Sequence, residues 1–368
     1  MKVGIDARLY NQTGVGVYIR NLLFYFRKFL PKSWQLFVYV IEPFDFSVPK
    51  NWKVKKVEAR WHSFSEQTIF LKKILKDNLD LMHFTYFSFP ILYNRPFVIT
   101  IHDLTPLKFK TGRASTKSKI IYEIKHFFYK IVLKTAITKA KGIIVPSKVV
   151  KKQLLEFGAK KEKIKVIYEG VDEEFKKVEG SPVSVKQPYF LYVGNFYPHK
   201  NVEFTLEGFW KFVRKKRQKI YFYLVGPNDF FAKRLKEKYK SIIGKKIAFF
   251  HKVSRSQLKF LYKNARALVH PSLSEGFGLT LLEAFYCNTP VLASDLEVFR
   301  EIYGDLPLYF NPRSEKDFLE KLSFVLSKMG KRNFKNLIGK YSFLQAAKDT
   351  LSFYKNREVS NSNLAGSK

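Results

Sequence analysis

Cysteine is nearly absent from this chain of 368 residues, in which Cys287 is the only one. A single thiol excludes an intrachain disulfide framework and a zinc site built from several cysteines, and it is typical of a reducing compartment. No uninterrupted apolar run approaches the roughly 18 residues that span a bilayer. The first residues run directly into a strand-like segment and lack the features of a signal peptide. We therefore expect a cytoplasmic protein without a membrane-spanning segment.

Several catalytic signatures are absent as well. None of the seven histidines forms an HExxH-type pair, and the sequence contains no Asp-x-Asp, so we expect no metal cofactor. No glycine loop ends in GK[ST], which excludes a P-loop, and the lack of a G-x-S-x-G elbow argues against an α/β-hydrolase. GVGVYI begins like a dinucleotide-binding fingerprint, but the third glycine is missing.

Acidic residues are scarce: 31 Asp and Glu stand against 67 Lys and Arg, which gives a net charge of +36. Such a charge attracts nucleic acid, an anionic bilayer or phosphate-bearing small molecules, although a generally Lys-rich surface would also explain it. Residues 108–152 hold thirteen Lys and Arg but one acid, Glu123, and include several aromatic residues. This pattern suits a membrane interface or single-stranded nucleic acid, and equally an amphipathic helix with a solvated lysine face.

The chain is rich in short apolar runs that alternate with longer amphipathic segments. This alternation is typical of doubly wound parallel sheets in the α/β class. Helices are predicted at 17–29, 65–76, 117–140 and 147–157, the last with Ser147 as its N-cap. Strands are predicted at 3–7, 35–40, 81–84, 97–101, 142–145, 165–168, 189–193, 220–225, 247–250, 267–270, 290–293 and 308–310.

A change of composition divides the pattern into two similar halves. Glycine and proline gather in a segment before residue 189, which we interpret as a linker. The predicted organisation is an N-terminal Rossmann-like domain at 1–178, a linker at 179–188 and a second Rossmann-like domain at 189–340. A helix at 341–355 that can pack back on the first domain and a disordered tail at 356–368 complete it. We expect the two domains to face each other across a cleft.

The most informative stretch is SLSEGFGLTLLEAFYCNTPVLAS, residues 272–294. A predicted strand leads into a glycine turn that begins with Glu275, and a helix follows from about Leu279. Glycines allow a ligand to approach the backbone, and a helix N-terminus offers N–H groups and the positive end of a dipole. Glu283 lies one turn into this helix, so the two glutamates can reach opposite ends of one elongated ligand. The stretch predicts an anion site suited to a diphosphate.

Here the sequence resembles a known family. Glu275 and Glu283, with GFGLTLL between them, match the Glu-x7-Glu motif of the retaining family 4 glycosyltransferases, which have the GT-B fold of two Rossmann-like domains. Other segments that resemble the family occur in its order: GIDARLYNQTGVGVYIRNL, ITIHDLTPL, IIVPSKVVKKQL, KVIYEGVDEEF, YVGNFYPHKN, YLVGP, SQLKFLYKNARALVHPS and TPVLASD. The resemblance covers about residues 2 to 330.

The resemblance implies roles for single residues. Glu283 would bind the ribose hydroxyls of a sugar nucleotide, and Glu275 the hydroxyls of the donor sugar. Lys200 would neutralise the diphosphate, for which a compact ammonium is suited. His102 would face the donor sugar from the first domain and, with Glu275 and Lys200, forms the expected catalytic set. The other donor-binding residues implied are Gly16, Gly194, Asn195, His199, Gly226, Val253, Gly276, Phe277, Gly278, Leu279 and Thr280.

The chain departs from the family's pattern in three places. Asn195 stands where many members have an arginine, so a second permanent cation on the phosphates is missing unless His199 partly replaces it. Thr280 replaces a common proline and adds an N–H and a hydroxyl near the phosphates. Asn288 stands where glycine is usual, and asparagine also tolerates a left-handed helix cap. Three histidines border apolar strands and are interpreted as structural: His83, His251 and His270.

The sequence therefore predicts a retaining hexosyltransferase that needs no metal. The PHKN and GFGLTLLEA segments most resemble bacterial mannosyltransferases of polysaccharide and lipopolysaccharide assembly, which makes GDP-mannose the first donor and UDP-glucose or another UDP-hexose the alternative. The expected acceptor is lipid- or glycan-linked. The enzyme would then work at the inner, anionic face of the cell membrane. The basic residues expected to meet that surface are Lys117, Lys119, Lys125 and Lys130. A nucleic-acid-binding protein, suggested by charge alone, leaves the paired glutamates unexplained.

Overall fold

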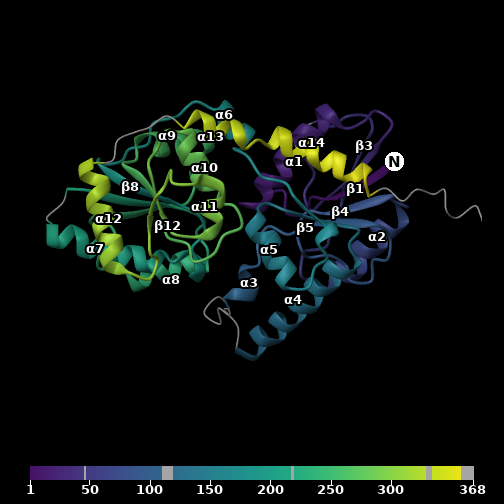
Figure 1. The fold of residues 1–368 in the computed structure, drawn as a ribbon, viewed down its shortest axis with the longest axis horizontal. Helices are drawn as coiled ribbons and strands as arrows, with labels where there is room; N and C mark the ends of the chain where they lie inside the picture. The colour runs from purple at the N-terminus through teal and green to yellow at the C-terminus, as the bar shows by residue number, and fades with distance from the viewer. Residues whose placement is uncertain (45–46, 110–118, 217–218, 329–333, 358–368) are drawn as a thin grey trace, which may run out of the picture. The chain divides into compact units, whose positions relative to one another are not determined.

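The computed structural model describes residues 1–44, 47–109, 119–216, 219–328 and 334–357, and its helices and strands are labelled as in Figure 1. The chain forms two compact units. The first comprises Met1–Leu104, Glu123–Glu169 and the described residues from Ser342 onward. The second comprises Thr105–Tyr122 and Gly170–Tyr341. The first unit is thus built from both ends of the chain.

The first unit contains a seven-stranded parallel sheet in the order β3-β2-β1-β4-β5-β6-β7. The pattern of apolar runs does not predict β3, because it is an edge strand with three lysines and only Trp52 fully buried. Its strands are β1 (Lys2–Asp6), β2 (Gln35–Val40), β3 (Trp52–Lys56), β4 (Leu81–Phe84), β5 (Phe97–Thr100), β6 (Gly142–Val145) and β7 (Ile164–Val166).

The helices of the first unit follow the predicted amphipathic segments. Ser147 is the N-cap of α5 as predicted, since its hydroxyl accepts the Val150 N–H at 3.2 Å. C-terminal α14 packs against α1 (Figure 1), with the rings of Phe26 and Tyr354 6.0 Å apart. The helices are α1 (Val15–Phe29), the π-helical η1 (Glu66–Phe70), α2 (Leu71–Lys76), α4 (Lys119–Lys139), α5 (Lys148–Glu156), the 3₁₀ turn η3 (Lys161–Lys163) and α14 (Phe343–Lys355).

His83 lies in the core of the first unit, which confirms its structural interpretation. It is fully buried on β4, with Nε2 2.7 Å from Oγ1 of Thr100 and Nδ1 hydrogen-bonded to the hydroxyl of Tyr354. Burial lowers the pKa of His83 to about 3, so the ring is neutral at physiological pH. This histidine ties C-terminal α14 to the sheet.

The second unit contains a six-stranded parallel sheet in the order β10-β9-β8-β11-β12-β13. Its central strands are buried along their whole length, because helices cover both faces of a doubly wound sheet. Its strands are β8 (Tyr189–Val193), β9 (Tyr221–Val225), β10 (Ile247–Phe250), β11 (Ala267–His270), β12 (Val291–Ser294) and β13 (Leu308–Phe310).

The helices of the second unit form two groups, and Figure 1 shows the strands between them. Helices α7 and α12 pack together, and α10 packs with α9 and with α13. Aromatic residues such as Phe190, Phe209 and Phe318 fill the core beneath α7 and α12. The helices are α3 (Thr105–Lys108), α6 (Glu173–Lys177), η4 (Pro198–Lys200), α7 (Val202–Lys216), α8 (Phe230–Lys238), α9 (Arg255–Asn264), α10 (Leu279–Tyr286), α11 (Glu297–Tyr303), α12 (Glu315–Lys328) and α13 (Lys335–Lys340).

Candidate active site

The glycine turn connects the carboxyl end of β11 to the N-terminus of α10. Gly278 is the N-cap of α10 and has a φ of 92°, and a Cβ atom built on it would lie 2.6 Å from the ring of Phe299. A side chain at this position would therefore be strained and would also clash. The first turn of α10 contains no acidic residue and no side-chain cap. The helix thus presents N–H groups and a positive dipole end, as a site for an anion requires.

Glu275 is the centre of a polar cluster in this turn. Its Oε1 atom accepts hydrogen bonds from Nζ of Lys200 at 2.6 Å, from the hydroxyl of Ser272 at 2.7 Å and from Nε2 of His270 at 2.9 Å. Burial alone would raise the pKa of this carboxyl, but the Lys200 ammonium and the His270 ring outweigh it and lower the pKa well below its usual range. Glu275 is therefore ionised, and three donors fix one of its oxygens.

Lys200 comes from the turn that follows β8. Leu273 of the glycine turn donates its N–H to the carbonyl of His199 at 2.8 Å, so the backbones of the two turns are joined. The Lys200 side chain is 17% exposed, which leaves its ammonium accessible while it pairs with Glu275. The sequence placed Lys200 and Glu275 in one site, and the structure brings them into direct contact.

His270, which the sequence analysis interprets as structural, belongs to the same cluster. It ends β11 and is 3% exposed. Because a carboxylate only accepts, the Nε2 atom next to Glu275 carries a proton, and Nδ1 lies 3.2 Å from Oγ1 of Thr280. His270 therefore connects the glutamate to the hydroxyl that replaces the family's proline.

Glu283 occupies a different environment on the first turns of α10. The hydroxyl of Tyr262 donates to Oε2 at 3.0 Å, and Nη1 of Arg255 lies 3.9 Å from Oε1. Burial raises the pKa of Glu283 to about 7, and the opposing effects of Arg255 and Tyr262 do not cancel it. The two glutamates of the motif thus differ in charge state: Glu275 is firmly ionised, and Glu283 titrates near neutral pH.

The other donor-binding residues expected in the second unit lie at strand ends and in loops. Gly194 follows β8, the carbonyl of Asn195 accepts the Tyr192 hydroxyl, and the carbonyl of Gly226 after β9 lies 2.9 Å from Nδ1 of His251. The Phe277 side chain is buried against the Tyr341 ring, so only its backbone is left for a ligand. Val253, Gly276 and Leu279 lie in the loop before α9, in the glycine turn and at the start of α10.

Gly16 and His102 belong to the first unit and are described within it. A Cβ atom on Gly16 would lie 2.7 Å from the carbonyl oxygen of Tyr10, so the loop after β1 packs too closely for a side chain. His102 has Nε2 3.0 Å from the carbonyl of Thr85 and Nδ1 3.1 Å from Oε1 of Glu169. Both ring nitrogens of His102 therefore face oxygen atoms of the first unit. The role of His102 toward a donor sugar stays a prediction.

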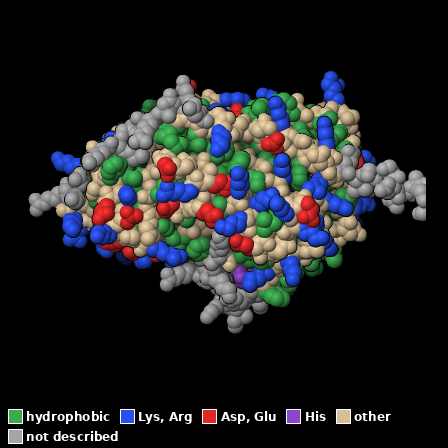
Figure 2. All heavy atoms as spheres, in the orientation of Figure 1, with side chains coloured by type: hydrophobic (Ala, Val, Ile, Leu, Met, Phe, Trp, Pro, Cys, Tyr) green, Lys and Arg blue, Asp and Glu red, His purple; other side chains and the backbone are tan. Residues whose placement is uncertain are grey.

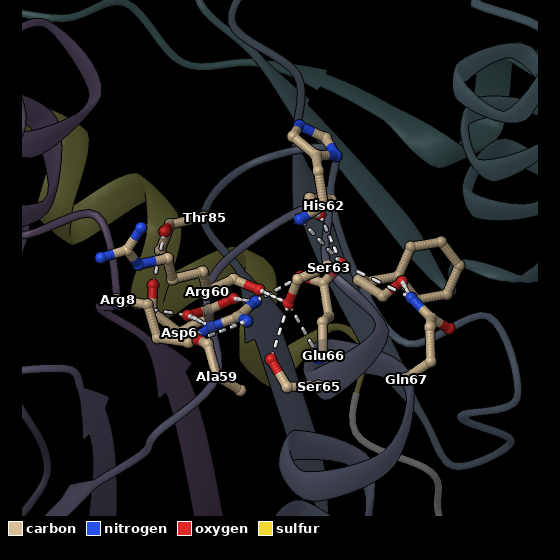
Figure 3. A network of polar contacts seen from close by, with 12 residues as sticks. Asp6, Arg8, Ala59, Arg60, His62, Ser63, Ser65, Glu66, Gln67 and Thr85 are labelled. Atoms are coloured by element: carbon tan, nitrogen blue, oxygen red, sulfur yellow. Dashed lines mark hydrogen bonds and ion pairs between the residues drawn. The ribbon is translucent and has the colours of Figure 1, made fainter. Parts of the chain in front are cut away.

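A buried charge network fixes the end of β1 in the first unit, and Figure 3 shows it. Nη2 of Arg8 lies 2.7 Å from Oδ2 of Asp6 and 2.6 Å from Oε1 of Glu66. Glu66 also accepts hydrogen bonds from the Ser88 hydroxyl at 2.7 Å and from the His62 N–H at 3.2 Å. The network joins the segments that follow β1, β3 and β4, where a doubly wound sheet carries its ligand-binding loops.

The structure describes only some of the lysines predicted to face a membrane. Lys117 lies outside the described residues, as do the side chains of Lys119 and Lys125. Lys130 is exposed on α4, where Phe127 and Phe128 are 62% and 58% exposed. Among the described residues, no helix has the length and apolarity to cross a membrane. In the same part of the chain, no group of three or more His, Cys, Asp or Glu is placed to hold a metal ion.

Two α/β units, with a glycine turn at a helix N-terminus, a lysine and two glutamates in the second of them, are typical of a glycosyltransferase of the GT-B type, and comparisons with known proteins agree. The "Glycosyltransferase Family 4" model matches residues 13–175, and the "Glycosyl transferases group 1" model matches residues 172–340. The sucrose-phosphate synthase structure from Thermosynechococcus elongatus has a TM-score of 0.76 at 17% identity, covering 97% of this chain and 98% of that one.

Two curated relatives are named as O-antigen chain mannosyltransferases. The chain is 30% identical to the O-antigen chain mannosyltransferase RfbU of Salmonella typhimurium over 295 residues, which are 77% of this chain and 75% of that protein. It is 33% identical to the O-antigen chain mannosyltransferase B of Escherichia coli over 132 residues, 34% of this chain and 33% of that one. The chain belongs to the family 4 glycosyltransferases.

Sequence reasoning missed several residues of the site. His270 follows a buried strand at its carboxyl end, where α/β proteins place ligands, and this signal was available. Arg255 starts a helix, where the dipole disfavours a cation, and that unusual position was also a signal. The partners Asp172 and Glu169 lie far from Arg255 and His102 in the chain, and no spacing rule connects them.

Proposed function

We propose that this glycosyltransferase moves mannose from GDP-mannose to a lipid- or glycan-linked acceptor of cell-surface polysaccharide synthesis, with retention of the anomeric configuration. The observation that carries this proposal is the arrangement of Glu275, Lys200 and Glu283 around the N-terminus of α10. It offers, in turn, groups for a sugar, a diphosphate and a ribose. Mannose is supported by the two curated relatives, whose names describe O-antigen chain mannosyltransferases.

Each group of the site receives one part of the donor in this proposal. Oε1 of Glu275 already accepts three hydrogen bonds, so we assign Oε2 to the hydroxyls of the donor sugar. The Lys200 ammonium and the N–H groups of α10 neutralise the diphosphate. Ionised Glu283 accepts hydrogen bonds from the ribose hydroxyls.

The chemical step needs no covalent nucleophile from the protein. The acceptor oxygen bonds to the anomeric carbon on the face that the phosphate leaves, while the bond from that carbon to the phosphate oxygen breaks. The proton of the acceptor hydroxyl passes to the departing phosphate oxygen, which leaves as GDP. Protein groups act by positioning the reactants and by stabilising the charge that develops on the diphosphate. His102 is proposed to contact the donor sugar.

A thermal-shift screen followed by product analysis tests the proposal. A ligand that binds only the native state raises the unfolding temperature, and GDP-mannose is expected to do so more than UDP-glucose, UDP-galactose or ADP-glucose. A larger rise in unfolding temperature with a UDP-hexose would make that sugar nucleotide, and not GDP-mannose, the assigned donor. Binding of oligonucleotides without binding of any sugar nucleotide would contradict the glycosyltransferase function. NMR of the product distinguishes retention from inversion. Activity is expected to survive EDTA, and a loss that manganese restores would contradict the metal-free mechanism.

We further propose that the enzyme acts at the inner face of the cell membrane, bound peripherally to anionic lipid. One observation that supports this is the net charge of +36. Another is that α4 carries exposed aromatic residues, Phe127 and Phe128, followed along the same helix by exposed Lys130 and Lys134. Aromatic rings suit the headgroup region, and each lysine near an anionic surface contributes about 1 kcal/mol. Figure 2 shows Lys and Arg side chains spread over the visible face, with fewer Asp and Glu.

A further inference from the structure

Arg255 occupies an unfavourable position in its own helix. It is the first residue of α9, where the helix dipole disfavours a cation, and the first turn of α9 contains no acidic residue. The structure supplies carboxylates from elsewhere instead. Nη2 lies 2.8 Å from Oδ2 of Asp172, and Nη1 lies 3.9 Å from Oε1 of Glu283. The guanidinium therefore lies between two carboxylates whose side chains are 3% and 7% exposed.

Among the described residues, Arg255 is the cation that faces Glu283. Lys259, one turn further along α9, donates its ammonium protons to two backbone carbonyls at the end of α6 and after it. Tyr262 donates its hydroxyl to Oε2 of Glu283. The titratable and charged groups around this carboxylate are Arg255 and Tyr262 from α9, Asp172 ahead of α6, and Cys287, which lies near Tyr262 at the end of α10.

We propose that Arg255 is a positioning residue of the donor site: held by Asp172, its guanidinium keeps the Glu283 carboxylate ionised and directed toward the ribose hydroxyls of a sugar nucleotide. This inference rests on the proposed function and adds two residues to it. An isolated carboxylate in this buried position favours its protonated form, which cannot accept two hydrogen bonds from a diol as well as the charged form can. The Arg255 charge opposes that tendency.

Arg255 and Asp172 affect the pKa of Glu283 in opposite directions, and this gives the proposal a sign. The pKa of Glu283 is already about 7, with Arg255 lowering it and Asp172 raising it. Arg255→Gln removes the cation, so Glu283 stays protonated to higher pH. Asp172→Asn removes the negative charge and releases the guanidinium toward Glu283, so Glu283 ionises at lower pH. Asparagine is as good an N-cap as aspartate, so α6 keeps the cap that Asp172 provides.

The experiment measures GDP-mannose affinity by calorimetry from about pH 5.5 to pH 9, a range that spans the ionisation of Glu283. A sugar nucleotide is used because its diphosphate does not titrate here, whereas free GDP does. In the wild type, affinity is expected to fall as the pH decreases through the pKa of Glu283. The midpoint should move up in Arg255→Gln and down in Asp172→Asn. At a pH below the midpoints of both the wild type and Arg255→Gln, the variant should bind about tenfold more weakly for each pH unit by which its midpoint lies above that of the wild type.

Lys263→Gln is the matched control, because it removes one exposed cation from the far end of α9, and its midpoint should equal that of the wild type. Arg255→Lys should keep part of the effect. Equal loss of affinity at every pH in Arg255→Gln, or midpoints that move together in both variants, would overturn the inference and leave the proposed function intact. A wild type that binds neither GDP-mannose nor any UDP-hexose would overturn both.

Discussion

The Nζ atom of Lys200 lies 2.6 Å from Oε1 of Glu275, although the two residues are 75 positions apart in the chain. The cation expected at the diphosphate is therefore already held by the carboxylate expected at the donor sugar. A partly buried ion pair of this kind fixes both side chains before a ligand arrives, and such preorganised charge stabilises a developing anion effectively. The pair also means that a change in either residue alters the charge of the other's surroundings.

Lys200→Ala and Glu283→Ala are each expected to reduce kcat/KM with the donor by at least about tenfold, or 1.4 kcal/mol of transition-state stabilisation. Lys200→Ala removes the diphosphate cation and also leaves Glu275 without its strongest partner. Lys211→Ala removes an exposed lysine that pairs with Glu315 and should be neutral. Wild-type turnover in folded Lys200→Ala and Glu283→Ala variants would show that the site is assigned wrongly.

His270→Phe is expected to lower kcat about tenfold while the protein stays folded. Phenylalanine keeps the ring contact with Phe299 but removes the hydrogen bonds to Glu275 and Thr280. Thr280→Val should have a smaller effect, and because both act through one chain of hydrogen bonds, the double variant should match His270→Phe alone. Additive losses, or an effect on the unfolding temperature without one on kcat, would assign His270 to packing only.

Arg8→Met is expected to lower the free energy of unfolding by about 3–5 kcal/mol, because it leaves the buried carboxylates of Asp6 and Glu66 without their cation. Lys56→Met is the comparison, since it breaks an exposed ion pair with Glu58 and should cost less than about 1 kcal/mol. Urea unfolding of both variants measures the difference. Equal stability of the two would mean that the network in Figure 3 contributes little.

Replacing Lys117, Lys119, Lys125 and Lys130 by glutamine is expected to reduce co-sedimentation with anionic vesicles and to leave GDP-mannose binding unchanged. Wild-type binding should exceed that to neutral vesicles and should fall as salt rises, because salt screens the attraction. A matched variant takes the same charge from exposed lysines of the second unit: Lys211, Lys233, Lys238 and Lys240. Equal loss in both variants would make the effect one of net charge rather than of this segment.

Much of the fold follows from local pattern. All twelve predicted strands overlap strands of the structure. The poorest match is the strand predicted at 165–168, which shares two residues with β7. Buried parallel strands are continuous apolar runs, which is why they are visible in the sequence. Edge strand β3 was missed because its lysines hide that signal, and the π-helical start of the 65–76 segment has no periodicity of its own to reveal it. Asn288 adopts the left-handed conformation expected of it, with a φ of 55°.

The sequence by itself determined the glycine turn with Glu275 and Glu283, because a strand–turn–helix unit places its residues at fixed offsets along the chain. The order of several motifs gave the resemblance to the family, and that resemblance implied Lys200. Only the tertiary structure decided what those residues are paired with. Lys200 pairs with Glu275, Asp172 pairs with Arg255, and His270 contacts Glu275 as well. The physical reason is that burial and a neighbouring charge set the ionisation of a carboxylate, and both come from segments that lie far apart in sequence and meet only when the sheet is formed.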